Sequence, residues 1–276
     1  MSLPPDFLFS QSNLQDFVDC PRRFELRYIL KQPWPALQPE PVLEWEQSLL
    51  QGLRFHQLIL QYLIGMPAEI LTQTIYDHKL QRWWDNFLTD DPLGELPSER
   101  YPEFTLSSPF AGFRLIAKYD LIAVDPGKRI VIVDWKTASP RTNPNSLRER
   151  IQSRLYPLLV VKAGHHINRE VVNPEQVEMI YWFAEKPSAP FCIQYNQTEY
   201  LKDSEYITRL ITKIASLQLG KFELTLDDRR CAFCNYQTLC NRGKQPGNLE
   251  DLEEESYQEL EDKIQIDIDQ IGAIQF

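Results

Sequence analysis

The stretch from Ile130 to Thr137, which reads Ile-Val-Ile-Val-Asp-Trp-Lys-Thr, most constrains how this chain can fold. Four consecutive β-branched residues are typical of a strand that is buried on both faces. Because side chains alternate along a strand, Asp134 and Lys136 are predicted to point to the same side. A carboxylate and an ammonium at the end of a core strand suit metal-assisted hydrolysis. They suit a surface salt bridge equally well, so this stretch alone leaves both interpretations open.

The composition is that of an ordinary globular protein. The chain has 276 residues, of which 43% are hydrophobic and 25% charged. No apolar run approaches the length of a membrane span, and the N-terminus does not resemble a signal peptide. We therefore expect a cytoplasmic location.

The net charge of −10 argues at first sight against binding to nucleic acid. Residues 245–276, however, hold ten Asp and Glu and one Lys, so this segment carries −9 of that charge. The charge predicts a nearly neutral body, residues 1–244, followed by an acidic C-terminal tail, residues 245–276. A local basic groove on the body therefore remains compatible with the composition.

Hydrophobic periodicity predicts the elements around the central strand. Ser10 or Ser12 is expected to cap a helix that begins the chain. Further helices are predicted over residues 43–64, 69–88, 146–163 and 199–219, and strands over 103–105, 112–124, 129–137, 176–184 and 191–195. His56 falls on or beside the buried face of the second helix, where a histidine is more often a core residue than a ligand.

An acidic residue also lies inside the strand over 112–124. Asp120 is flanked by Tyr119 and Leu121, and a buried carboxylate is costly unless something pairs with it. The turn over residues 125–128 predicts an antiparallel meander that brings Asp120 near Asp134. Two close carboxylates repel each other, and a divalent cation relieves that repulsion.

The helix over residues 146–163 carries a second polar group. Gln152 and Tyr156 are four residues apart and therefore share a face, and Pro157 is expected to kink the helix. The surrounding arginines form the most basic patch in the chain: Arg148, Arg150 and Arg154. The patch is either a substrate-binding surface or a solvated helix face.

The five cysteines favour a metal site over a disulfide framework. Cys231, Cys234 and Cys240 have the spacing C-x2-C-x5-C, and Cys20 beside Pro21 is the natural fourth ligand. Cys192 lies in a strand pattern and is predicted to be a buried hydrophobic residue.

Taken together and in this order, these motifs resemble the PD-(D/E)XK nuclease superfamily. The resemblance extends to the RecB-like nucleases with an iron–sulfur cluster, such as the nuclease domain of the bacterial AddB subunit and the CRISPR-associated four-cysteine exonucleases. It covers Phe9 to Arg242. The residues that carry it are Ser10-Gln11-Ser12, Cys20-Pro21, His56, Asp120, Asp134, Lys136, Gln152, Tyr156, Cys231, Cys234 and Cys240. Ala117 departs from the glycine that the family usually has three residues before its first aspartate.

The resemblance implies a mixed α/β (α+β) fold with a restriction-endonuclease-like core, in which helices flank a central mixed sheet. Residues 1–244 would form the nuclease domain, with a helical part over about 1–100, a core over about 101–220 and a cysteine motif over 229–243. A cluster would join the N- and C-terminal segments.

The resemblance also implies roles for individual residues. Catalysis would rest on Lys136, Asp134 and Asp120, and one or two Mg²⁺ or Mn²⁺ ions would be held by His56, Asp120, Asp134 and the backbone carbonyl of Trp135. Substrate-binding candidates are Gln152, Tyr156, Arg148 and Arg154, and Glu103 is a further candidate acid. Cys20, Cys231, Cys234 and Cys240 would bind a 4Fe–4S cluster, with zinc as the alternative.

The implied activity is metal-dependent hydrolysis of DNA, as an exonuclease on single-stranded ends, in DNA repair or recombination or in CRISPR adaptation. The implied partners are DNA and a helicase or CRISPR-adaptation protein, without a membrane. The alternative is a non-catalytic DNA-binding or scaffold subunit of a helicase–nuclease complex. The acidic tail is either a DNA mimic, a docking segment for a partner, or a solvated tail.

Overall fold

A computed structural model describes residues 3–32, 42–137, 144–231 and 234–242. The predicted acidic tail over residues 245–276 lies outside the described residues. Within the described ranges, no helix combines the length and the apolar character that crossing a bilayer demands.

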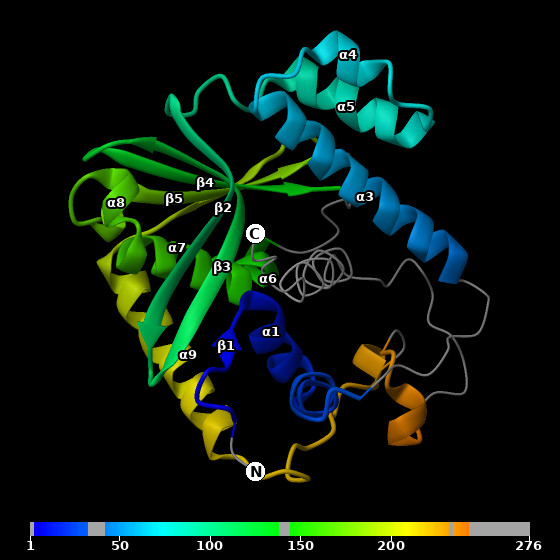
Figure 1. The fold of residues 1–276 in the computed structure, drawn as a ribbon, viewed down its shortest axis with the longest axis vertical. Helices are drawn as coiled ribbons and strands as arrows, with labels where there is room; N and C mark the ends of the chain where they lie inside the picture. Colours follow the sequence, from blue (N-terminus) through cyan, green and yellow to red (C-terminus); the bar gives the residue numbers. More distant parts are fainter. Residues whose placement is uncertain (1–2, 33–41, 138–143, 232–233, 243–276) are drawn as a thin grey trace, which may run out of the picture.

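A six-stranded mixed sheet forms the centre of the fold (Figure 1). Its strands are β1 Leu8–Phe9, β2 Glu99–Phe110, β3 Phe113–Asp125, β4 Arg129–Lys136, β5 Val177–Phe183 and β6 Phe191–Gln194. The order is β1-β3-β4-β5-β6, and β2 also pairs with β3. β2, β3 and β4 form the predicted antiparallel meander, whereas β1–β3 and β4–β5 are parallel pairs.

Helices cover both faces of this sheet. The α-helices are α1 Gln11–Asp19, α2 Pro21–Phe24, α3 Val42–Leu63, α4 Ala68–Thr72, α5 His78–Asp90, α6 Pro144–Glu149, α7 Ile151–Ala163, α8 His165–Asn168 and α9 Gln197–Ser216. Shorter turns are the π-helix η1 Glu25–Ile29 and the 3₁₀-helices η2 Pro174–Gln176, η3 Asp228–Cys231 and η4 Gln237–Cys240. The mixed sheet with flanking helices agrees with the expected fold class.

Two hydrophobic clusters correspond to the two faces. One joins α1, α7 and α9 to the sheet, and the other joins α3 and α5 to the opposite face, as the arrangement in Figure 1 shows. Along β4, Ile130 and Ile132 belong to the first cluster, and Val131 and Val133 belong to the second. This alternation fits the prediction that the strand is buried on both faces.

The alternation along β3 shifts by one residue at Asp120. Tyr119 and Ile122 both belong to the cluster on the α7 side, whereas Leu121 belongs to the α3 side. Glu103 of β2, which lies opposite Asp120 between two paired residues, has a φ of +51°. Such a local irregularity re-aims a side chain while the flanking strand stays paired. Asp120 is therefore the residue at which the alternation of β3 between the two faces of the sheet is interrupted.

Two predicted helices are each divided in the structure. The expected helix over residues 69–88 is wrong: α4 ends before Gln73, and α5 starts anew after Asp77, whose side chain accepts from Leu80 N at 2.8 Å. Short polar side chains that bond to nearby backbone groups compete with helix continuation in this way. The helix over 146–163 breaks at Arg150, which is extended with a ψ of 148°. Pro157, in contrast, lies inside α7.

Of two further local predictions, the helix cap at Ser10 is confirmed and the burial of Cys192 is wrong. Ser10 caps α1 and accepts from Asn13 N at 3.4 Å, as expected. Cys192 is exposed on β6, so its prediction as a buried residue is wrong. A strand pattern fixes alternation but does not say which face another layer covers.

Tyr119 connects β3 to α7 through a buried contact. Its hydroxyl donates to the backbone carbonyl of Tyr156 at 3.0 Å, and the two rings lie 4.7 Å apart. Burial raises the pKa of Tyr119 well above its usual value, so the hydroxyl stays protonated and remains a donor. This contact fixes the distance between the sheet and the helix that carries Gln152.

We therefore expect Tyr119→Phe to lower the free energy of unfolding by about 1–2 kcal/mol, because a buried carbonyl loses its donor. Urea denaturation followed by far-UV circular dichroism measures the change. Tyr76→Phe is the matched control, because Tyr76 is 92% exposed. Equal midpoints for both variants would contradict the role given to this hydrogen bond.

Candidate active site

The pairing between strands β3 and β4 stops before the end of β4. Their pairing runs from Asp125↔Arg129 to Leu121↔Val133 and ends there. The next free amide on β4, that of Trp135, donates to the Asp120 carboxylate at 2.8 Å. We call this place, formed by Asp120, Asp134, Trp135 and Lys136, the fork. At the fork a side chain replaces the backbone acceptor of the neighbouring strand.

The other edge of β4 remains paired beyond the point where β3 leaves. It continues to pair with β5 as far as Lys136↔Phe183, and Ala184 N donates to the Lys136 carbonyl at 2.8 Å. The Trp135 ring packs on the α5 side, 5.7 Å from Phe87. Asp134 and Lys136 therefore lie together on the side of the sheet that α7 covers.

Asp134, Lys136 and Gln152 form a compact buried group. Lys136 Nζ lies 2.9 Å from Asp134 Oδ2 and donates to Gln152 Oε1 at 3.2 Å. The Gln152 amide donates in turn to Asp134 Oδ1 at 2.5 Å. All three residues are buried. This confirms that Asp134 and Lys136 share one side, and Gln152 reaches them from α7 as a bridge.

His56 reaches the fork from the other face of the sheet. Its Nδ1 lies 3.4 Å from Asp120 Oδ1. α3 packs against the second hydrophobic cluster through Phe55, the residue before His56. The site thus draws one residue from α3 and one from α7, with the two strand carboxylates between them.

The two carboxylates differ in their electrostatic environment. Burial raises the pKa of Asp120, but the charge and hydrogen bond of His56, the Trp135 amide and the Lys136 charge outweigh burial and hold that pKa below its usual value. Burial, together with the charge of Asp120, raises the pKa of Asp134 to about 6 although Lys136 opposes this. The pair therefore concentrates negative charge that neighbouring groups only partly neutralise.

This donor set fits a divalent cation. Asp134 Oδ2 is buried, and its approach to Lys136 is an ion pair without hydrogen-bond geometry. Carboxylate oxygens with an imidazole suit Mg²⁺ or Mn²⁺. Among the described residues, no three His, Cys, Asp or Glu side chains are already drawn together as ligands.

The remaining predicted substrate-binding residues lie farther out or are engaged by the protein. Tyr156 is buried against Tyr119, and Arg154 pairs with Asp203 at 2.8 Å. The Arg148 guanidinium lies over the Phe191 ring, 5.6 Å from its centroid. The structure thus separates the arginines, and their roles toward substrate stay predictions.

Glu103, the further candidate acid, forms an ion pair with Lys118 of β3. Sequence reasoning missed Tyr181, whose hydroxyl lies 2.7 Å from Ser153 Oγ and donates to Gln152 Oε1 at 3.5 Å. Tyr181 stands beside Asp134 in the β4–β5 register. The sequence did not reveal Tyr181 because it does not show that β4 and β5, which are far apart in the chain, pair in parallel.

The four cysteines of the predicted cluster come from both ends of the described chain. Cys20 lies between α1 and α2, Cys231 ends η3 and Cys240 ends η4. Burial, with smaller contributions from the nearby Cys20 and Cys231, raises the pKa of Cys234 to about 11. Burial likewise raises the pKa of Cys240, again with Cys20 and Cys231 contributing. Cys20, Cys231, Cys234 and Cys240 are thus close enough to affect one another electrostatically, but in the described part of the chain no three of them are grouped as metal ligands.

Residues 8–241 match the PD-(D/E)XK nuclease superfamily. The chain belongs to the PD-(D/E)XK nuclease superfamily. Membership supports a nuclease that hydrolyses phosphodiester bonds of DNA, and nucleases of this superfamily generally use divalent metals such as Mg²⁺. The predicted motif residues Asp120, Asp134 and Lys136 all lie within the matched range.

Solved structures add a likeness of fold. The crystal structure of a "putative exonuclease" from Eubacterium rectale is similar with a TM-score of 0.53 and 11% identity, covering 88% of this PD-(D/E)XK chain and 91% of that chain. The crystal structure of SSO0001 aligns over 84% of this chain and 85% of that one, with 14% identity and a TM-score of 0.42 that carries no argument. Among curated protein sequences, none matches.

The raised pKa of Asp134 predicts a cost to stability in the metal-free protein. Because the folded state binds this proton more tightly than the unfolded state, stability is lost as the pH rises from 3.8 to about 6. We expect Asp134→Asn to raise the free energy of unfolding by about 1–3 kcal/mol at pH 8 with a chelator present. Mg²⁺ should then stabilise the wild type more than the variant.

Thermal unfolding with and without Mg²⁺ measures both effects. Asp85→Asn is the matched control, because Asp85 is an exposed acid on α5 that accepts from Gln81. A metal-free Asp134→Asn protein that is less stable than the wild type would refute the electrostatic description of the fork.

Proposed function

We propose that this chain is a metal-dependent DNA exonuclease that hydrolyses phosphodiester bonds at single-stranded ends. The observation that supports this most is the convergence of Asp120, Asp134, Lys136 and His56 at the fork. A non-catalytic subunit has no need for an intact pair of Asp134 and Lys136. The alternative of a DNA-binding scaffold is therefore less favoured.

Asp120, Asp134 and His56 would hold the cation, together with the Trp135 carbonyl. When bound, the cation supplies an activated water and neutralises charge on the scissile phosphate. Lys136 orients the attacking water or stabilises the negative charge that develops on the phosphorus oxygens. Gln152 keeps the Lys136 ammonium and the Asp134 carboxylate in register, because it bonds to both.

DNA would be positioned by groups on α7 and its surroundings. Gln152, Arg148 and Arg154 are the proposed substrate contacts, with Tyr156 shaping the helix face behind them. Phosphate contacts of this kind orient a strand without reading its sequence. The proposed setting is DNA repair, recombination or CRISPR adaptation beside a helicase or adaptation partner.

An assay on end-labelled DNA tests the activity. With Mg²⁺ or Mn²⁺, we expect the wild type to shorten linear single-stranded DNA from an end and to leave circular single-stranded DNA intact. Lys136→Ala and Asp134→Ala should each reduce the rate at least about 100-fold, because both act on the charge that develops in the transition state.

Lys128→Ala is the matched control, since Lys128 lies in the turn before β4 and is 76% exposed. It should cleave like the wild type. Undiminished cleavage by both fork variants would reject the assignment of the active site. Cutting of circular DNA would reject the exonuclease assignment while leaving a nuclease.

We further propose that Cys20, Cys231, Cys234 and Cys240 bind a 4Fe–4S cluster that joins the two ends of the nuclease domain. The neighbouring thiols from both ends support it. Its role is structural, because the proposed catalytic group lies at the fork. Zinc is the alternative for four thiolates.

Protein purified without oxygen should be brown, contain iron and sulfide, and lose its visible absorbance with dithionite. Cys234→Ser should remove the colour, whereas Cys192→Ser should keep it, because Cys192 lies on β6. A colourless protein with one zinc per chain would contradict the iron–sulfur assignment.

A further inference from the structure

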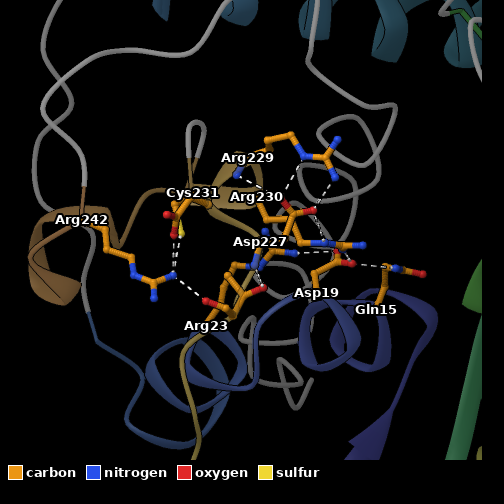
Figure 2. A network of polar contacts seen from close by, with 10 residues as sticks. Gln15, Asp19, Arg23, Asp227, Arg229, Arg230, Cys231 and Arg242 are labelled. Atoms are coloured by element: carbon orange, nitrogen blue, oxygen red, sulfur yellow. Dashed lines mark hydrogen bonds and ion pairs between the residues drawn. The ribbon is translucent and has the colours of Figure 1, made fainter.

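An ion pair joins the residues next to two of the cysteines (Figure 2). Asp19 is the last residue of α1 and precedes Cys20, and Arg230 precedes Cys231 in η3. The guanidinium of Arg230 pairs with the Asp19 carboxylate. The contact thus joins residues that are more than two hundred positions apart and that each precede a cysteine in the chain.

The Asp19 carboxylate is buried and surrounded by donor groups. The Asp19 side chain is only 1% exposed. It also pairs with Arg23 at 3.1 Å and accepts from Gln15 Nε2 at 3.1 Å. A buried carboxylate stays charged only when donors and cations surround it. Gln15 and Arg23 of the N-terminal segment supply some of these partners, and Arg230 of η3 supplies a further one.

Neighbouring contacts explain why the protein should fold without Arg230. Arg22 N donates to the Glu223 carbonyl at 3.0 Å, and the Tyr236 hydroxyl donates to the Gln32 carbonyl at 3.2 Å. These bonds attach the C-terminal segment on either side of η3. Arg230 lies between these two attachment points in the sequence and directly precedes Cys231.

We propose that the Asp19–Arg230 ion pair is a positioning contact that holds Cys20 beside Cys231, Cys234 and Cys240 before any metal binds. The inference rests on the proposed thiol site. Holding ligands in place beforehand lowers the entropy that metal binding must overcome. The pair therefore affects metal affinity, while the thiols alone contact the metal.

Arg229 provides a matched control next to Arg230. Its side chain pairs with Asp227 and is 91% exposed. Both arginines, labelled in Figure 2, contact Asp227, Arg229 through Nε at 2.9 Å and Arg230 through Nε at 3.7 Å, whereas the ion pair with Asp19 belongs to Arg230. Arg229→Gln and Arg230→Gln remove the same charge at nearly the same distance from Cys231, but only the second breaks the contact with α1.

The test is titration of the metal-free, full-length protein with Co²⁺ in the absence of oxygen. Absorption from sulfur-to-cobalt charge transfer reports how many thiolates bind, and its rise gives the affinity. We expect Arg230→Gln to weaken binding about tenfold, and Arg229→Gln to stay within about twofold of the wild type. Arg230→Lys should recover most of the affinity, because an ammonium can still pair with Asp19.

Asp19→Asn supplies a second, independent variant. If the two side chains act as a pair, the double variant should lose less affinity than the two single losses combined. Additive losses, or an Arg230→Gln protein that binds Co²⁺ like Arg229→Gln, would overturn the inference. A wild type without a thiolate band would overturn the thiol site as well, whereas DNA cleavage by the same sample would leave the nuclease assignment in place.

Discussion

The hydrogen bond from the Trp135 amide to the Asp120 carboxylate is the interaction on which the rest of the site depends. A buried amide that leaves a sheet ladder must find another acceptor, or the protein loses stability. Asp120 is that acceptor, so β3 and β4 can separate without an unsatisfied donor. The separation leaves room for Asp120 of β3 and Asp134 of β4 to lie near each other where the pairing of the two strands ends.

The same arrangement concentrates charge in the interior, and both helical layers help to offset it. His56 approaches Asp120 from α3, and Lys136 is held between Asp134 and the Gln152 amide from α7. Removing charges from water costs free energy that close partners only partly return. The raised pKa of Asp134 reflects the part of this cost that Lys136 and His56 do not offset.

Local sequence patterns predicted the parts of this site that depend on neighbouring residues. Strand alternation placed Asp134 and Lys136 on one side, and the short turn before Arg129 placed Asp120 beside Asp134. The break at Arg150 and the left-handed backbone at Glu103 escaped prediction, because neither residue type signals such a conformation. Contacts across layers, such as Tyr181 with Gln152, depend on packing between segments that the sequence does not place side by side.

The division of the site between the two faces of the sheet also orders its completion in time. His56 precedes every residue of the central meander, and Gln152 follows it, so both flanking helices must be synthesised before the site around the fork is complete. The lysine and the acids emerge earlier, without the amide that aligns them. A partly synthesised chain that ends before α7 therefore lacks one of the two helical layers that contact the site.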